Sequence, residues 1–495
     1  MSERRRLFIE SNVDADTIQK LLVLGGLIAE AQNFDIVIGE RPNTPDQTSS
    51  FANLYLKEFQ IIREKGKTKS LELSSLVVAL FKQITLLNSR RRLLNLKVNG
   101  ILVGPIIYDT YLGNYTKGSV DIYDLRLVKT IFQIVRQVRV ASVTLKRANP
   151  DALLLSHRIG LTGGIYALLA ALEGIPVFNF GGDTKISLDR SLDPHAYLYR
   201  PNINDLIWFR NLSEHSLSAY FENAKNAHLG YELARDTERA FGGQEVKTKS
   251  ELFELLGVKD CENPIVFILA HVPNDYPNAL GASDLYSDYH DWLVRTLEII
   301  ESIDSVTWIV KEHPSMANYS FDNKYFDDLE TRFASRNVHF LRHSDNFSAK
   351  SLRHLASAVI TCKGSAGFEL PALYGIPTIY WTGAFYSFFK VGTEISNWAE
   401  FASLLNSFNN FTLGNLPLDI REAKSCYIFV YLQSRLDLNL NPPSTQSDLL
   451  SNQVAERMKV IHDYYLANFE LIEKQKAMFV RQLSRENFQA IRQID

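Results

Sequence analysis

The sequence has few of the residues and segments that define several large classes of protein. Its 495 residues include only three cysteines, Cys261, Cys362 and Cys426, which lie far apart and form no C-x-x-C pair. Neither a disulfide framework nor a structural zinc site is therefore expected, and a reducing cytosol fits this composition. No stretch approaches the roughly 18 uncharged apolar residues that a membrane-spanning helix needs, since Ser75–Phe81 and Ile265–Val272 are only short runs.

The first residues lack the apolar segment of a secretory signal peptide. Arg4–Arg6 are basic, as in such a signal, but only Leu7–Ile9 follows before the chain becomes polar. We therefore expect a cytoplasmic protein, soluble or at most peripheral to the inner membrane, with Arg4–Arg6 as candidates for contact with anionic lipid. The formal net charge is −3, so no general attraction to nucleic acid is expected either.

Predicted strands and helices alternate along the first half of the chain. Apolar runs predict strands at residues 7–10, 35–39, 100–104, 151–156 and 177–180. Helical periods separate them, at residues 18–27, 70–96, 121–147 and 161–173. Parallel strands need crossover connections, so this alternation predicts a parallel sheet with helices on both faces. Residues 1–250 are expected to form a Rossmann-like domain.

The same alternation restarts after a connection near Gly242–Asp260. Strands are predicted at residues 264–270, 306–310, 338–341, 357–361 and 377–380, with helices at 284–303 and 367–374. Residues 260–440 should therefore form a second Rossmann-like domain. The last segment, residues 446–495, is helical in pattern and has no Gly or Pro between Gln453 and Arg492. It is expected to pack across both domains or, as the alternative, to mediate oligomerisation.

Polar residues follow one strand of the second half directly. Open parallel sheets bind ligands at the carboxyl ends of their strands. Lys311, Glu312, His313 and Pro314 come after the strand at 306–310, which places a cation, a carboxylate and an imidazole at one strand end. Taken alone, this tetrapeptide is as well explained by solvated charges and a turn histidine.

A loop of small residues follows another strand and opens a helix. Such a loop exposes unpaired N–H groups and the positive end of the helix dipole, which together suit a phosphate. Lys363 and Ser365, Ala366 and Gly367 lie in this loop. Glu369 in the first helical turn could accept hydrogen bonds from the ribose hydroxyls of a nucleotide. Its alternative role is to stabilise the helix dipole.

Together these segments resemble the nucleotide-binding half of GT-B glycosyltransferases of the capsule and surface polysaccharide biosynthesis group. Lys311-Glu312-His313-Pro314 is followed by Gly364-Ser365-Ala366-Gly367-Phe368-Glu369 and by Gly375-Ile376-Pro377. The resemblance covers mainly residues 264–392. It implies an α/β fold of two Rossmann-like domains facing a central cleft, with the first domain binding the acceptor. It also implies that His313 contacts the donor phosphate or ribose, that the backbone of Ser365–Gly367 holds phosphate, and that Glu369 holds ribose.

The implied reaction moves a sugar from a nucleotide-sugar donor, such as CMP-Kdo, to a growing capsule, lipopolysaccharide or glycolipid. The leaving phosphate could be stabilised by helix N–H groups with Lys311, Lys363 or His313 nearby, without a divalent ion. No Asp-x-Asp follows a predicted strand, so neither a metal nor a cofactor besides the donor is predicted. His271, after the first strand of the second half, could approach the donor or serve as a satisfied loop histidine.

The acceptor hydroxyl would need a general base from the first domain. Asp109 lies among aromatic residues, where partial burial would raise its pKa, although an N-cap or turn aspartate explains it as well. His157 and Asp183 follow later strands and could replace it, and the spacing does not rank the three. The chain lacks the acidic-acidic-Gly motif of some relatives, so no base is carried over from the resemblance.

Two other functions fit the same motifs. A CDP-glycerol or CDP-ribitol phosphotransferase also resembles the pairing of a His-Pro motif with a Ser-containing loop. A non-catalytic scaffold on a GT-B fold is the alternative from another class. A nicotinamide-dependent dehydrogenase is disfavoured, because no G-x-G-x-x-G follows the first strand.

Overall fold

The computed structural model divides the chain into two compact units. It describes residues 4–10, 15–40, 52–63, 69–86, 89–179, 187–189, 210–229, 245–258, 262–279, 283–316, 324–431 and 454–483. The first unit comprises residues 1–107, 122–197 and 433–495, and the second comprises residues 108–121 and 198–432. This division differs from the predicted ranges in two ways. Residues 108–121 and 198–250 were predicted in the first domain but belong to the second unit, and the C-terminal segment belongs to the first unit.

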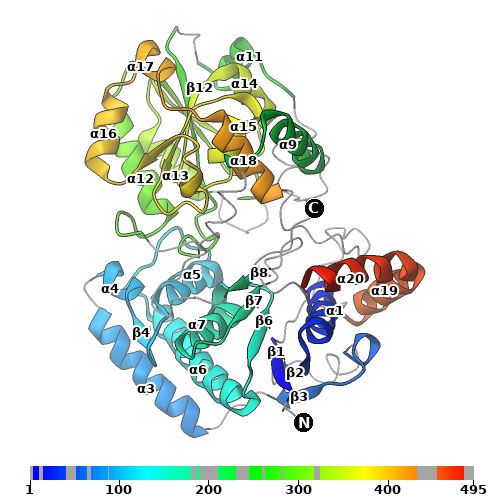
Figure 1. Ribbon diagram of the computed structural model, residues 1–495. Helices are drawn as coiled ribbons and strands as arrows, with labels where there is room; N and C mark the ends of the chain where they lie inside the picture. Colours follow the sequence, from blue (N-terminus) through cyan, green and yellow to red (C-terminus); the bar gives the residue numbers. More distant parts are fainter. Residues whose placement is uncertain are drawn as a thin grey trace. The chain divides into compact units, whose positions relative to one another are not determined.

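The first unit is built on a six-stranded sheet in the order β3-β2-β1-β6-β7-β8 (Figure 1). The strands are β1 Arg5–Ile9, β2 Phe34–Glu40, β3 Gln60–Arg63, β6 Ala152–Leu155, β7 Val177–Asn179 and β8 Ser187–Asp189. All neighbours are parallel except β7 and β8. Leu7, Phe8 and Ile9 are fully buried, as a strand covered on both faces requires.

One predicted strand of the first half is wrong. Of residues 100–104, only β5 Ile101–Leu102 is extended, and it pairs antiparallel with β4 Lys97–Val98 in a separate two-stranded sheet. Helix α5 Gly104–Tyr115 begins directly afterwards. Pro105 in its first turn favours a helix start, because proline has no N–H to donate and its φ suits the helix.

Helices cover the first sheet and include the C-terminal segment. Their bounds are α1 Ala15–Gln32, α3 Lys69–Leu86, α4 Arg90–Leu94, α6 Leu125–Ala148, α7 Ile165–Leu172, α19 Val454–Ala467 and α20 Phe469–Leu483, with a short π-helix η1 at Gly160–Gly164. Ile461, Tyr465 and Ile472 join the same buried core as Leu21 and Leu24 of α1. The predicted C-terminal helical segment is thus confirmed, and it packs on the first unit.

The second unit contains a fully parallel sheet in the order β11-β10-β9-β12-β13-β14. The strands are β9 Ile265–Leu269, β10 Thr307–Lys311, β11 Val338–Leu341, β12 Ala356–Thr361, β13 Thr378–Trp381 and β14 Thr393–Ile395. The strand order reverses between β9 and β12, and this reversal opens a crevice at the carboxyl ends of the strands. The predicted α/β class with two Rossmann-like sheets and a helical C-terminal segment is confirmed.

Helices pack on both faces of the second sheet. Their bounds are α9 Glu214–Leu229, α11 Lys249–Leu255, α12 Tyr289–Ile300, α13 Lys324–Phe333, α14 Leu352–Leu355, α15 Ala366–Tyr374, α16 Trp398–Asn406, α17 Asn410–Gly414 and α18 Ile420–Tyr431. Short 3-10 turns lie at Ala349–Ser351 and Ser387–Phe389. Within the described ranges, none of the helices of either unit combines the length and the hydropathy needed to span a bilayer.

Candidate functional site

A cavity of about 280 Å³ lies at the carboxyl edge of the second sheet. Its polar lining comes from the segments that follow β9, β10 and β12, the three strands at the reversal of strand order. Six of the eight predicted donor-binding residues line it: His271, Lys311, His313, Ser365, Ala366 and Glu369. The other two, Lys363 and Gly367, are buried beside these residues in the chain but do not line the cavity.

The His-Pro segment holds its imidazole in one tautomer. The Nδ1 atom of His313 accepts a hydrogen bond from the backbone N–H of Ser315 at 3.1 Å. An acceptor nitrogen carries no proton, so the proton of the neutral ring sits on Nε2. His313, which lines the cavity, therefore has Nε2 as its N–H donor.

His271 is held against the loop after β12. Its ring stacks on Tyr289 with centroids 4.2 Å apart, and its Nε2 accepts the backbone N–H of Lys363 at 3.3 Å. Burial, with smaller contributions from His313 and Lys363, lowers the pKa of His271 to about 3, so this ring is neutral at physiological pH. Gly364 permits the close approach, because a Cβ there would lie 3.1 Å from Cε1 of His271.

The N-terminus of α15 offers two backbone donors. Ser365 occupies the N-cap position but its side chain makes no capping hydrogen bond. The N–H of Gly367 donates to Gly364, and those of Phe368 and Glu369 donate to Ser365. In the described part of the chain, the N–H groups of Ser365 and Ala366 have no acceptor.

Gly367 has a packing role instead of a free donor. Its N–H is used within the first turn, and a Cβ at this position would overlap the hydroxyl of Tyr386. Of the predicted phosphate-binding backbone of residues 365–367, the first two positions thus keep their donors for a ligand.

Glu369 is a buried carboxylate at the edge of the cavity. It is 6% exposed, and its Oε1 accepts a hydrogen bond from the hydroxyl of Tyr431 on α18. Tyr431 in turn stacks on His228 of α9, with ring centroids 3.9 Å apart. Burial lowers the pKa of His228, although the charge of Glu369 opposes the shift. No donor among the described residues is placed on Oε2, so this oxygen can accept from a ligand.

Sequence reasoning missed both His228 and Tyr431 as lining residues. His228 lies in a stretch that the sequence marked only as polar, aromatic and helical, and no motif surrounds Tyr431. The one available signal is the aromatic content of α18, whose Tyr427 also contacts Nδ1 of His228 at 2.5 Å.

Two charged residues of the Lys311–Pro314 segment differ in their surroundings. Lys311 is 8% exposed, and burial lowers its pKa to about 8, against the opposing charges of Glu312 and Asp345. Its Nζ lies 6.0 Å from the ring centroid of Phe347. Glu312 is engaged by the protein, since its Oε2 accepts the backbone N–H of His343 at 2.9 Å and lies 2.6 Å from Nδ1 of that ring.

Asp109 does not lie where the sequence predicted it. It sits within helix α5 instead of directly after a strand, and it belongs to the second unit instead of the acceptor domain. Its oxygens accept hydrogen bonds from the backbone N–H of Asn278 at 3.2 Å and from its Nδ2 at 2.8 Å. The predicted position of Asp109 after a strand is wrong, because Pro105 lies at the start of a helix there.

Burial dominates the electrostatics of Asp109. It raises the pKa of this carboxyl to about 8, against the hydrogen bonds from Asn278 and the charge of Lys363. Burial likewise lowers the pKa of Lys363, against the charge of Asp109. Asp109 does not line the cavity, and its contacts give it a structural role in holding residues 108–121 to the second unit. Its role as a base stays a prediction without support from these contacts.

The other two predicted bases belong to the first unit. His157 is exposed and directly follows Ser156, which caps the end of β6 by donating to Glu10. Gly163 of η1 lies against the carbonyl oxygen of His157, so closely that a Cβ there would overlap it. Asp183 lies outside the described residues. Of the two predicted bases that the structure describes, Asp109 is buried in the second unit and His157 is exposed in the first.

No metal centre is found in the part of the chain that the structure describes, where no three His, Cys, Asp or Glu side chains are grouped to hold an ion. The polar groups of the cavity include imidazole, ammonium, backbone N–H and the carboxylates of Glu312 and Glu369. These groups recognise an anion and hydroxyl groups directly.

Neither a protein-family model nor a curated protein matches this chain. Among solved structures, a UDP-N-acetylglucosamine 2-epimerase from Rickettsia bellii is similar at 11% identity, over 94% of this chain and 98% of that chain, with a TM-score of 0.26. A glycosyltransferase from Rickettsia africae is 8% identical over 94% and 100% of the two chains, with a TM-score of 0.25. Anabaena HepE in complex with UDP-glucose is 10% identical over 92% and 98%, with a TM-score of 0.27. Likeness at these scores bears on neither the reaction nor the substrate of this chain.

Proposed function

We propose that this chain is a glycosyltransferase that binds a nucleotide-sugar donor in the cavity of the second unit. The observation that carries the proposal is the convergence of three different groups on that cavity. These are the imidazole of His313, the two N–H groups of Ser365 and Ala366, and the buried carboxylate of Glu369. They come from two segments, the loop after β10 and the N-terminal turn of α15, which meet where an open parallel sheet binds ligands.

The phosphate side of the donor matches the cationic and N–H groups. Ser365 and Ala366 supply N–H donors at a helix N-terminus, where the dipole also favours negative charge. His313 can donate from Nε2, and the ammonium of Lys311 adds positive charge. When the bond between sugar and phosphate breaks, charge grows on the leaving phosphate, and donors already in position stabilise it without reorganising.

The nucleoside side matches Glu369 and an apolar wall. The Oε2 atom of Glu369 can accept a hydrogen bond from a ribose hydroxyl while Tyr431 holds Oε1. Leu269, Leu352 and Leu370 also line the cavity, and such apolar side chains suit the faces of a planar base. The whole lining thus divides into a part for phosphate and a part for nucleoside.

The finer assignment is a CMP-activated sugar such as Kdo, transferred to a bacterial surface polysaccharide or glycolipid. Its support is the resemblance of the Lys311–Pro314 and Gly364–Pro377 segments to that group of transferases. Binding measurements can identify the nucleotide base of the donor. The bond formed in the product separates the glycosyltransferase from the phosphotransferase that shares these motifs.

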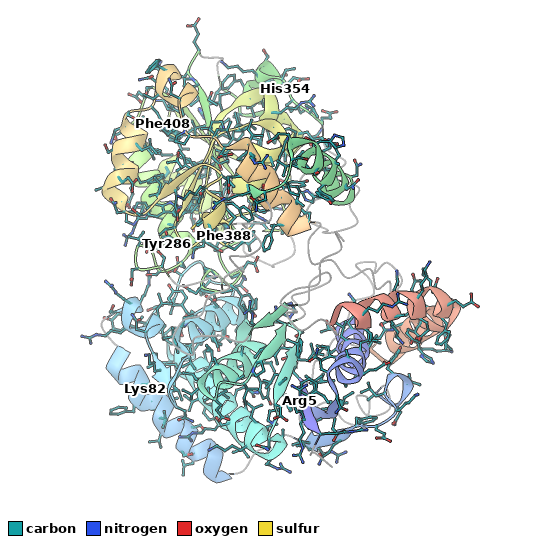
Figure 2. The ribbon with its side chains drawn as sticks, in the orientation of Figure 1. Arg5, Lys82, Tyr286, His354, Phe388 and Phe408 are labelled. Carbon is teal, nitrogen blue, oxygen red and sulfur yellow. The ribbon has the colours of Figure 1, made fainter. Side chains whose placement is uncertain are left out.

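Thermal unfolding with CMP, CDP, UDP or GDP tests the donor site. A ligand at about 100 times its Kd stabilises the native state by about 2.7 kcal/mol, so at least one nucleotide should raise the Tm. His313→Ala should remove this shift. His354→Ala is the matched control, because this imidazole is exposed on α14 of the same unit and does not line the cavity (Figure 2). A Tm that none of the four nucleotides changes contradicts the proposal.

Product analysis tests the reaction itself. Incubation with the activated sugar of the nucleotide that binds, and with a glycan acceptor, should yield a glycosidic bond and the free nucleotide. A phosphodiester in the product would assign the chain to the CDP-glycerol kind of phosphotransferase instead. Nucleotide binding without turnover on any acceptor would favour the scaffold.

A further inference from the structure

Among its described side chains, helix α3 of the first unit exposes five large apolar residues and buries two small residues. Ser75 and Ala79 are fully buried. The exposed fractions of the large residues are 65% for Leu73, 41% for Leu76, 57% for Val77, 45% for Leu80 and 64% for Phe81. A helix at a protein surface normally has the reverse arrangement, with its large apolar residues toward the core.

These five side chains form one continuous stripe, which is called the α3 apolar face below. They follow one another at spacings of three and one residues, the spacing that keeps side chains on one side of a helix. The opposite side packs on α6, where Arg139 donates to the hydroxyls of Ser74 and Ser75 at 2.5 and 3.1 Å. Figure 1 shows α3 running along the outer side of α6. An exposed apolar patch of this kind marks an interaction surface.

Positive charge predominates beside the α3 apolar face. From Glu72 to Lys97 the sequence has five cations, Lys82, Arg90, Arg91, Arg92 and Lys97, and one acidic residue, Glu72. Arg90, Arg91 and Arg92 are exposed on α4, which is anchored by the buried Leu93 and Leu94. Lys82 lies one residue after Phe81 near the end of α3, and Figure 2 labels it there.

We propose that α3 and α4 dock the first unit on a phospholipid surface that carries anionic headgroups. In this arrangement α3 lies in the plane of the interface with the α3 apolar face among the acyl chains, and the arginines of α4 meet the headgroups. Charge decides the occupant. A second copy of the chain would bring five more cations against one acidic residue from residues 72–97, whereas anionic lipid supplies the opposite charge.

Vesicle sedimentation tests this docking without any nucleotide, so its outcome is independent of the donor site. The wild-type chain should sediment with vesicles of phosphatidylcholine mixed with phosphatidylglycerol, and much less with phosphatidylcholine alone. Val77→Glu/Phe81→Glu should weaken partitioning at least roughly 10-fold, because two apolar side chains are lost and two like charges are added. Replacing Arg90, Arg91 and Arg92 by Gln should weaken it roughly fivefold for each charge removed.

The matched control is Phe411→Glu, which changes a phenylalanine that is 79% exposed on α17 of the second unit. It should leave partitioning unchanged. All altered residues are exposed, so each variant should keep the wild-type Tm. Equal sedimentation of the wild type and Val77→Glu/Phe81→Glu overturns the proposal. A second result would also overturn the proposal. If light scattering shows a wild-type dimer, the double variant is a monomer and neither protein binds vesicles, then the α3 apolar face binds a second copy of the chain.

Discussion

Replacing Glu369 by Gln tests the ribose assignment at a single atom. In the wild type, Oε1 of Glu369 accepts from Tyr431, and Oε2 has no donor among the described residues. Glutamine has nearly the same size, and its carbonyl oxygen can still accept from Tyr431. Its amide nitrogen, however, is a donor and cannot accept a hydrogen bond from a ribose hydroxyl. The substitution therefore removes one ligand interaction and little of the fold.

The magnitude follows from the burial of this carboxylate. A hydrogen bond to a charged group contributes about 1.5–3 kcal/mol. Glu369 is only 6% exposed, so water screens the interaction little. Since each 1.4 kcal/mol corresponds to about tenfold in an equilibrium constant, the nucleotide should bind roughly 10- to 100-fold more weakly to Glu369→Gln.

Calorimetry with two ligands separates the ribose contact from a general effect on the site. The ribonucleotide identified by the thermal screen should lose affinity for Glu369→Gln, whereas its 2′,3′-dideoxy counterpart should bind both proteins equally. Glu394→Gln is the matched control, since Glu394 is a half-buried carboxylate on β14 that does not line the cavity. Wild-type affinity of Glu369→Gln for the ribonucleotide, or an equal loss for both ligands, would refute the ribose contact.

Three further predictions concern pH and packing in the second unit. Nucleotide affinity should fall as the pH rises through about 8, because burial lowers the pKa of Lys311 to about 8 and the neutral amine no longer attracts phosphate. Calorimetry at about pH 7 and pH 9 checks this prediction. In Lys311→Met, the affinity should no longer depend on pH in this range. Gly364→Ala should displace Thr361 and His271 and so weaken nucleotide binding, because its Cβ would lie 2.9 Å from Oγ1 of Thr361 and 3.1 Å from Cε1 of His271. Gly414→Ala, with nothing within 4 Å of its Cβ, should not weaken binding. Asp109→Asn should gain stability over the wild type as the pH rises from about 4 to 8, by up to about 1.4 kcal/mol per pH unit, because the raised pKa of Asp109 makes the folded state hold a proton that the unfolded state releases. Urea unfolding at about pH 5 and pH 8 measures this difference, and an equal difference at both pH values would contradict it.

The two sheets could be predicted because a buried parallel strand leaves a local signal. Residues 265–269 are a continuous apolar run within the strand predicted at 264–270, and the structure has β9 Ile265–Leu269 there. Short edge strands leave no such signal. In β3, Gln60–Arg63, only one residue is buried, and this strand was not predicted.

The gathering of the donor-site residues was predictable for a topological reason. Every strand of a parallel sheet ends at the same edge, so residues that follow β9, β10 and β12 meet once the sheet forms. His271, His313 and Ser365 could therefore be grouped without knowledge of any side-chain contact, and the cavity lining contains all three.

The amino-acid order by itself determined the buried parallel strands and the residues at their ends, because these depend on periodicity and on neighbours in the chain. Only the tertiary structure decided that Tyr431 holds Glu369, that Asn278 draws Asp109 into the second unit, and that α3 turns its large side chains outward. Each of these depends on contacts between segments far apart in the sequence. Such contacts are set by how whole elements pack, and no local pattern encodes the partner.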